Sequence, residues 1–220
     1  MYNQNTSIDE RTGLPKIILD LCGGTGSWSK PYRDAGYDVR IITLPDNDVR
    51  AYTPPKNVYG ILAAPPCTEF SVLNCKAEQR VRNEADGLEI VSACLWIIKK
   101  CKSNGNLRFH AIENPVGFLR NHLGKPPFTF QPWYFGDPWT KHTDVWGSFN
   151  LPEPAFHDWD DVPKLPLYTR PGRDKPNFAY LHKSAWNLIP QLNYHKPSSD
   201  AEFRAMTPPG FAQAFFEANQ

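Results

Sequence analysis

The sequence predicts an α/β fold with a mainly parallel sheet, helices on both faces and a small proline-rich C-terminal part. Short apolar runs alternate with helical segments in the order strand, helix, strand, strand, helix, strand, which is typical of parallel sheets. Of 22 prolines, none lies between Cys67 and Asn114, whereas 15 occur from Pro115 onward. Because proline is excluded from helix interiors and central strands, we expect regular elements in the first half and loops in the second.

Four short apolar runs, bounded by glycine, proline or polar residues, predict the strands: residues 16–21, 37–44, 58–64 and 108–113. A first helix is expected over residues 27–35, where it follows a glycine cluster and is ended by Gly36.

A longer helix is predicted from apolar residues that are three and four apart and share one face: Leu88, Val91, Leu95 and Ile98. Three lysines in its last turn and Gly105 after it are typical of a helix C-terminus. Cys94 and Cys101 are seven residues apart within this helix, so we assign them to its packing.

Length and composition predict a globular protein with one substantial domain, since 40% of the 220 residues are hydrophobic and 21% are charged. The formal net charge of +1 removes the global signature of a nucleic-acid-binding protein but allows a local basic groove. No run approaches the roughly 20 apolar residues that span a bilayer. Five cysteines without a C-x-x-C pair argue against a disulfide scaffold or a zinc ribbon and favour a reducing, cytoplasmic setting.

Three polar or glycine-rich clusters follow predicted strands, at the sheet edge where α/β proteins bind ligands. The first runs from Asp20 to Ser27 and leads into the first helix. Its glycines let a ligand approach the backbone, and a helix N-terminus offers free N–H groups to an anion. Ser29 stands where the dinucleotide fingerprint requires a third glycine, so NAD binding is only weakly supported. A simple tight turn explains this cluster equally well.

The second cluster contains Cys67, which follows two prolines at the end of the third strand. A buried structural thiol is the ordinary interpretation of a cysteine, but rigid presentation on a strand-end loop is what a nucleophile requires. The third cluster, Glu113-Asn114-Pro115, places a carboxylate at a strand end on the same rim. A solvated glutamate and a simple turn asparagine are the alternatives there.

In this order, the clusters resemble the motifs of the cytosine carbon-5 DNA methyltransferases, especially compact phage and prophage members. Asp-Leu-Cys-Gly-Gly-Thr-Gly resembles the family's S-adenosylmethionine loop, Asp48-Val49 the pair that contacts adenine, and Pro65-Pro66-Cys67 the nucleophile motif. Glu113-Asn114-Pro115 resembles the family's Glu-Asn-Val, and residues 135–143 lie where the family has a Gln-x-Arg-x-Arg strand. The resemblance covers residues 15–147 and implies a Rossmann-like S-adenosylmethionine-dependent methyltransferase fold.

The resemblance also implies roles for individual residues. Cys67 would be the nucleophile, Glu113 would donate a proton or hydrogen bond to ring N3, Asn114 would orient Glu113, and Lys141 would contact phosphate or the base carbonyl. The implied donor-binding residues are Asp20, Leu21, Cys22, Gly23, Gly24, Thr25, Gly26, Ser27, Trp28, Asp46, Asp48, Val49, Pro65 and Pro66. The implied substrate-binding residues are Ser71, Pro115, Thr143, Arg170 and Arg173.

The chain departs from the family pattern in three places. Lys141 and Thr143 replace two arginines, which alters the grip on the flipped base. No acidic residue ends the second strand, where Asp46 is the candidate substitute, and the late Gly-Asn-Ser-Val motif is missing, although residues 207–215 resemble the closing helix of phage members.

We expect three parts in the chain. These are a catalytic domain over residues 1–150, a loop-rich substrate- or target-recognition segment over 151–200, and a C-terminal helix over 201–220 that packs back on the catalytic domain. Aromatic residues such as Trp133, Trp139 and Trp146 are candidates for base stacking, although tryptophans more often pack in cores.

The implied function is methyl transfer from S-adenosylmethionine to carbon-5 of cytosine, through a covalent adduct between Cys67 and carbon-6 of a flipped base. The expected partner of this monomeric enzyme is double- or single-stranded DNA. No metal is expected, because the six histidines lack metal-binding spacing. Two alternatives stay open: a related transferase that uses a carboxylated donor or acts on RNA, and a non-catalytic nucleic-acid binder, against which the intact Cys67 and Glu113 argue.

Overall fold

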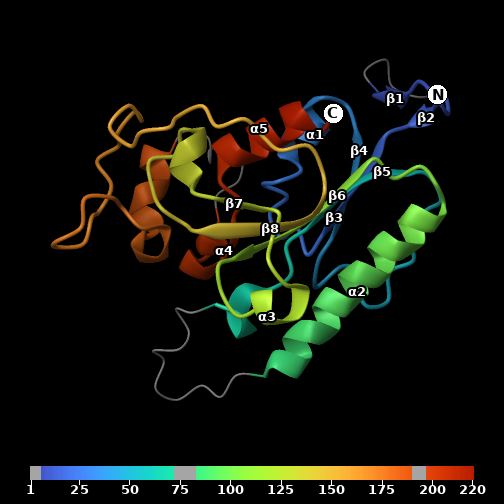
Figure 1. Cartoon of the computed structure of the whole chain (residues 1–220), viewed down its shortest axis with the longest axis horizontal. Helices are drawn as coiled ribbons and strands as arrows, with labels where there is room; N and C mark the ends of the chain where they lie inside the picture. Colours follow the sequence, from blue (N-terminus) through green and yellow to red (C-terminus); the bar gives the residue numbers. More distant parts are fainter. Residues whose placement is uncertain (1–5, 72–82, 190–196) are drawn as a thin grey trace.

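The computed structural model describes residues 6–71, 83–189 and 197–220. Its centre is a six-stranded sheet in the order β4-β3-β5-β6-β8-β7 (Figure 1). Its strands are β3 (Ile17–Leu21), β4 (Asp38–Ile42), β5 (Val58–Ala63), β6 (Phe109–Pro115), β7 (Phe128–Phe130) and β8 (Thr143–Ser148). The short strands β1 (Ile8–Asp9) and β2 (Leu14–Pro15) form a separate antiparallel pair.

The α-helices are α1 (Lys30–Asp34), α2 (Glu84–Ser103), α3 (Arg120–Leu123), α4 (Asp200–Ala205) and α5 (Pro209–Ala218). Short 3-10 turns are η1 (Cys67–Glu69), η3 (Pro132–Phe135), η4 (Phe178–Tyr180) and η5 (Lys183–Leu188). Among the described residues, no helix combines the length and the apolar character that crossing a membrane requires.

The direction of the strands confirms the expected α/β fold with a mainly parallel sheet. Strands β4, β3, β5 and β6 are parallel neighbours, whereas β8 runs antiparallel between β6 and β7. After β3 the chain forms β4 on one side and then returns past β3 to form β5 on the other side. The strand order therefore reverses between β3 and β5, and open α/β sheets bind ligands outside the carboxyl ends of the strands at such a point.

Helices cover both faces of the sheet, because alternate residues of its buried strands pack in opposite directions (Figure 1). On one face, Leu19 and Ile61 join a core cluster with Val91 and Cys94 of α2. On the other face the core cluster combines strand residues with α1, α5 and the loop before α1: Ile18, Leu62, Ala111, Trp28, Tyr32, Phe211 and Phe215. Helices α1 and α5 are in direct contact.

Two details of the predicted helices are wrong. The first helix is expected from Ser27, but α1 begins only at Lys30, because residues 27–29 form turns and Pro31 occupies the first helical turn. In α2, Leu95 is 40% exposed rather than part of the buried face. The residues buried there include Cys94 and Cys101, as expected.

The proline-rich segment from residue 151 to 189 wraps around a third, smaller core. Its regular elements are the turns η4 and η5. The core cluster contains residues from this segment, from α4 and from the loop before β8: Trp139, Leu167, Phe178, Leu181, Ala185, Ile189, Phe203 and Met206. Residues 190–196 of the expected recognition segment lie outside the described residues.

Candidate active site

The glycine-rich loop after β3 folds through residues with positive φ angles. Cys22 has φ 57°, Gly24 has φ 52° and Gly26 has φ 70°, so the chain turns three times within five residues. Gly23 is required for a different reason, since a Cβ there would lie 2.3 Å from Cγ of Asp20. Residues 22–25 remain partly or fully exposed, and they lie at the reversal of strand order beside β5. This stretch of backbone is therefore accessible to a ligand.

Asp20 supports the loop from inside the protein. Its side chain is completely buried, and its Oδ2 accepts a 2.5 Å hydrogen bond from Oγ of Ser29, while Oδ1 has no partner among the described residues. Burial raises the pKa of this carboxyl to about 6, and the bond from Ser29 opposes that rise. Asp20 and the buried Leu21 thus lie beneath the loop rather than on its accessible surface.

Two further predicted donor-binding residues have structural roles. The hydroxyl of Ser27 is buried and accepts a 2.8 Å hydrogen bond from the backbone N–H of Thr207. Trp28 is 2% exposed and packs edge-on against Phe215, with ring centroids 5.3 Å apart. Contact of the Trp28 side chain with a bound ligand is therefore contradicted by its burial in the core.

The segment expected to contact adenine is divided between core and surface. Val49 is buried in the core cluster under α2, so its side chain does not line an open site. The carboxylate of Asp48 accepts hydrogen bonds from the backbone N–H of Arg50 at 2.9 Å and from its guanidinium at 2.6 Å. Asp46 is exposed.

The Cys67 loop is attached to the end of β6 at two places. The amide Nδ2 of Asn114 donates a 2.9 Å hydrogen bond to the carbonyl of Pro65, two residues before the thiol. Further along, Ser71 forms an isolated antiparallel bridge with Gly117, and the N–H of Phe118 donates to the carbonyl of Phe70 at 2.8 Å. Asn114 therefore fixes the Cys67 loop, and Ser71 helps to hold that loop against the chain after β6.

Glu113 and Lys141 form a nearly buried ion pair beside this loop. Their side chains are 8% and 12% exposed, and Nζ of Lys141 lies 3.7 Å from Oε1 of Glu113. Nζ also donates a 3.4 Å hydrogen bond to the carbonyl of Met206 and lies 5.7 Å from the ring centroid of Phe178. The Lys141 side chain is therefore nearly buried and held beside Glu113, rather than solvated at the surface.

The electrostatic interactions connect Cys67 to both members of this pair. Burial raises the pKa of the Cys67 thiol; the nearby Lys141 cation opposes the rise and the Glu113 carboxylate adds to it. Burial likewise raises the pKa of Glu113, which Lys141 opposes and Asp144 increases. The site thus holds a thiol, a cation and a carboxyl group whose pKa lies above its ordinary value.

Two of the predicted substrate-binding residues, Pro115 and Thr143, lie in the antiparallel pair of β6 and β8. Pro115 pairs with Thr143 at the end of the ladder, and the completely buried hydroxyl of Thr143 donates to the carbonyl of Lys141 at 2.8 Å. Both residues shape the backbone around Lys141, and Thr143 does not reach a substrate.

Sequence reasoning missed the residues that complete this arrangement. Oε1 of Gln131 accepts a 3.0 Å hydrogen bond from the N–H of Lys141. The carboxylate of Asp144 is buried, yet it accepts two bonds from the guanidinium of Arg120, at 2.6 and 2.7 Å, and one from Thr129 at 2.7 Å. An acidic residue within an apolar strand, as at Asp144, is the one signal that pointed to such a partner.

The predicted arginines of the proline-rich segment, Arg170 and Arg173, are both exposed. Arg170 donates a 2.8 Å hydrogen bond to the hydroxyl of Tyr180 and stacks over its ring at 4.6 Å, and Arg173 is exposed. Trp139 and Trp146 are buried and belong to the core, so base stacking is contradicted for both. Trp133 is half-buried and lies 4.8 Å below the ammonium of Lys175.

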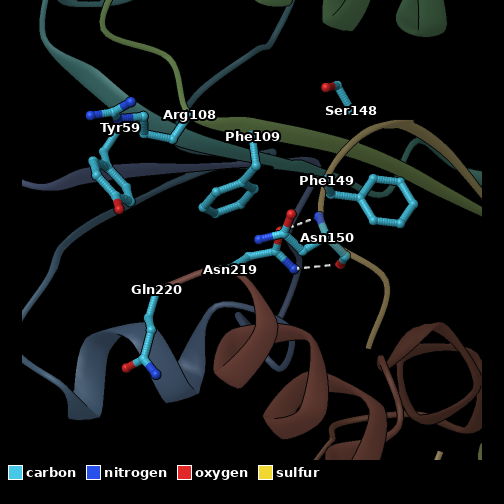
Figure 2. A pocket seen from close by; sticks show the side chains of 8 residues that line it. All are labelled: Tyr59, Arg108, Phe109, Ser148, Phe149, Asn150, Asn219 and Gln220. Atoms are coloured by element: carbon cyan, nitrogen blue, oxygen red, sulfur yellow. Dashed lines mark hydrogen bonds between the residues drawn. The ribbon is translucent and has the colours of Figure 1, made fainter. Parts of the chain in front are cut away.

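A hollow of about 170 Å³ lies at the opposite edge of the sheet (Figure 2). It is lined by the amino-terminal ends of β5 and β6, the end of β8 and the C-terminus: Tyr59, Arg108, Phe109, Ser148, Phe149, Asn150, Asn219 and Gln220. Asn219 closes its floor through paired hydrogen bonds with the backbone of Asn150, at 2.8 and 3.0 Å. The hollow is thus separated from the Cys67 rim by the length of the strands.

Within the described ranges, no three His, Cys, Asp or Glu side chains gather as a metal site requires. No protein-family model matches the chain, and no curated protein matches its sequence.

Proposed function

We propose that this chain is a cytosine carbon-5 DNA methyltransferase with the Rossmann-like fold of S-adenosylmethionine-dependent methyltransferases. The observation that carries the proposal is the convergence of Cys67, Glu113 and Lys141 on adjacent strand ends. Three groups from residues 67, 113 and 141 share one electrostatic environment there. This rim lies beside the glycine-rich loop, at the point where the strand order reverses.

The chemistry of cytosine explains why such a set is needed. Carbon-5 of the ring is a poor nucleophile until a group adds to carbon-6. The Cys67 thiolate adds to carbon-6, and a hydrogen bond or proton from Glu113 to ring N3 accepts the electron pair that this addition displaces. The carbon-5 so activated would attack the methyl group of the sulfonium donor, the carbon–sulfur bond would break with release of the neutral thioether, and ring N3 would return its proton to Glu113. Loss of the carbon-5 proton then returns an electron pair to the ring and expels the thiolate.

The donor site is assigned to the accessible loop. The residues that would hold S-adenosylmethionine are Cys22, Gly23, Gly24 and Thr25. The buried Pro65 and the exposed Pro66 follow β5, the strand that pairs with β3. The buried Oγ1 of Thr25, which has no partner among the described residues, supports a polar ligand at this place. When bound, this donor supplies the electrophilic methyl group.

The roles of the other residues follow from their contacts. Asn114 holds the Cys67 loop through the carbonyl of Pro65. Lys141 keeps a positive charge beside Glu113 and Cys67, which favours the thiolate over the thiol. A base inside a duplex cannot reach this rim, so the enzyme acts on a flipped or unpaired cytosine.

Covalent trapping tests the proposal. Ring carbon-5 of 5-fluorocytosine cannot lose a proton, so an oligonucleotide that contains it should remain bonded to Cys67 when S-adenosylmethionine is present. We expect a denaturation-resistant complex with the wild type and with Cys101→Ser, and none with Cys67→Ser. A complex that survives Cys67→Ser, or no complex with single- or double-stranded DNA, would contradict the proposal.

Mass spectrometry of nucleosides from treated DNA and RNA identifies the product. We expect 5-methylcytosine from DNA. A carboxymethyl group on carbon-5, or modification of RNA alone, would replace the proposed function by one of the related transferases, and an unmodified pool together with tight DNA binding would indicate a non-catalytic binder.

A further inference from the structure

The segment from Met206 to Gly210 contacts three separate parts of the candidate site. The carbonyl of Met206 accepts a hydrogen bond from Nζ of Lys141 at 3.4 Å. The next residue, Thr207, donates its N–H to the hydroxyl of Ser27 at 2.8 Å. At the start of α5, the N–H of Gly210 donates to Oδ2 of Asp137 at 2.9 Å.

The covalent geometry of this segment makes it stiff. Residues 208 and 209 are both prolines, so φ is restricted between the two anchored positions, Thr207 and Gly210. At Gly210 a Cβ would lie 2.1 Å from the carbonyl oxygen of Phe135, which shows how closely the backbone approaches η3. The carbonyl of Met206 thus directly precedes a stiff segment that is anchored to Ser27 at Thr207 and to Asp137 at Gly210.

We propose that Ser27 and Asp137 are positioning residues that, through the Met206–Gly210 segment, hold the Lys141 ammonium against Glu113 and Cys67. Neither residue touches the reacting groups. The inference rests on the proposed function for the purpose of the site, but its test needs neither DNA nor methyl donor.

The environment of Lys141 explains why its ammonium depends on this support. Its side chain is 12% exposed, so little water is available to replace a lost partner. Within the described part of the chain, Nζ contacts Oε1 of Glu113 at 3.7 Å and the carbonyl of Met206 at 3.4 Å, and both distances are long for hydrogen bonds. A shift of the Met206 carbonyl by one ångström would therefore break one of them and let the lysine turn away from Glu113.

The position of Lys141 determines the charges that Cys67 experiences. The charges of Lys141 and Glu113 shift the pKa of the Cys67 thiol. The charges of Lys141 and Asp144 shift the pKa of Glu113, and the Asp144 carboxylate is itself paired with Arg120. If Lys141 moves away, Glu113 loses its counter-charge and Cys67 loses the cation that favours its thiolate. The ionisation of Cys67 is therefore a direct readout of lysine position.

The test is the pH dependence of Cys67 alkylation by iodoacetamide between pH 6 and pH 10, measured by peptide mass spectrometry. Lys141→Met provides the reference and should move the midpoint upward. Asp137→Leu and Ser27→Ala should move it in the same direction and slow alkylation at pH 7 about threefold or more, because the thiolate is the reacting species. Asp137→Asn retains an acceptor for the N–H of Gly210 and should keep the wild-type profile.

Exposed counterparts, Asp174→Leu and Ser103→Ala, control for the substitutions themselves and should also match the wild type. If Asp137→Leu fails to fold, the test still compares Ser27→Ala, in which the midpoint of Cys67 alkylation should move upward, with Asp137→Asn, in which it should not move. The proposal is overturned if Lys141→Met alone moves the midpoint, if Lys141→Met leaves it unchanged, or if Asp137→Asn moves it as far as Asp137→Leu. Loss of the covalent DNA complex with an intact alkylation pattern would instead count against the proposed function.

Discussion

At the residue scale, adjacent glycines of the glycine-rich loop after β3 serve different purposes. Gly23 lies directly on the buried carboxylate of Asp20, whereas a Cβ at Gly24 would meet no atom within 4 Å. Gly24 is needed for its left-handed backbone, with φ 52°, and for the open space beside it. The sequence shows both as members of one glycine cluster, and only the packing beneath the loop separates them.

Substitutions at these two glycines should therefore have different effects. Gly23→Ala should lower the free energy of unfolding by about 2–3 kcal/mol, because the new methyl group overlaps a carboxylate that cannot leave the core. Gly24→Ala should cost about 1–2 kcal/mol, the cost of a left-handed backbone at a residue with a Cβ. Urea denaturation of both variants measures the difference, and equal losses would show that the loop relaxes around Asp20.

Glu113 is the second residue whose environment predicts a measurable effect. Glu113→Gln keeps the shape of the side chain but leaves the nearly buried ammonium of Lys141 without its counter-charge. It also removes the acid that supports addition to carbon-6, so the rate of covalent complex formation with 5-fluorocytosine DNA should fall about 10²–10⁴-fold. The exposed Glu153→Gln is the control. A Glu113→Gln rate within a few-fold of wild type would remove Glu113 from the mechanism.

At the element scale, the sequence predicts the strand ends but not what connects them. Apolar runs and breakers place Cys67 and Glu113 on the same edge because parallel strands share a direction, and the structure agrees. Lys141 lies just before β8, the strand that pairs antiparallel with β6. No apolar run in the sequence predicted this strand, and the place of Lys141 was inferred from the resemblance alone. The first helix was predicted but is shorter than expected, and the short strand β7 was not predicted, because tertiary packing rather than local periodicity decides such short elements.

The attachment of the Cys67 loop to β6 gives a prediction for one glycine. Gly117→Ala would put a Cβ 2.1 Å from the carbonyl oxygen of Phe70, where the loop pairs with Gly117 and Phe118. The loop must then move away from Glu113, so covalent trapping should fall by at least about tenfold even in protein that remains folded. Gly105→Ala, with no atom within 4 Å of the added methyl group, is the matched control. Unchanged trapping in folded Gly117→Ala would contradict this account of the loop.

At the scale of the whole molecule, the site is completed by contacts that join distant parts of the chain. Ser27 and Thr207 are 180 residues apart, and Lys141 and Met206 are 65 apart. Such contacts leave no periodic pattern in the sequence. The resemblance over residues 15–147 stops before Met206, so it did not indicate the support of Lys141 by the C-terminal segment. Asp137 lies within that range, but its partner Gly210 lies outside it.

Buried ionisable groups also shape the stability of the whole fold. Burial raises the pKa of Asp20 to about 6 and that of Asp137 to about 8, and burial lowers the pKa of His110 to about 4. A carboxyl with a raised pKa binds its proton more tightly in the folded state. The free energy of unfolding therefore falls as the pH rises from the pKa of that carboxyl in the unfolded chain to its pKa in the folded chain. For His110 the sign is reversed, and stability falls as pH drops from about 6.5 to about 4.

Of these three groups, Asp137 dominates the pH dependence above pH 7, where Asp20 is largely ionised and His110 is largely neutral in both the folded and the unfolded chain. Between pH 6.5 and pH 8, the stability of the wild type should fall by up to about 1.4 kcal/mol per pH unit. For a chain of this size that corresponds to a melting temperature about 4–8 °C lower at pH 8. Asp137→Asn cannot ionise and retains an acceptor for the N–H of Gly210, so its melting temperature should stay nearly constant over this range. The exposed Asp174→Asn should follow the wild type. A wild-type curve that is flat from pH 6.5 to 8, or a slope that persists in Asp137→Asn, would show that Asp137 ionises in the folded protein at no cost to stability.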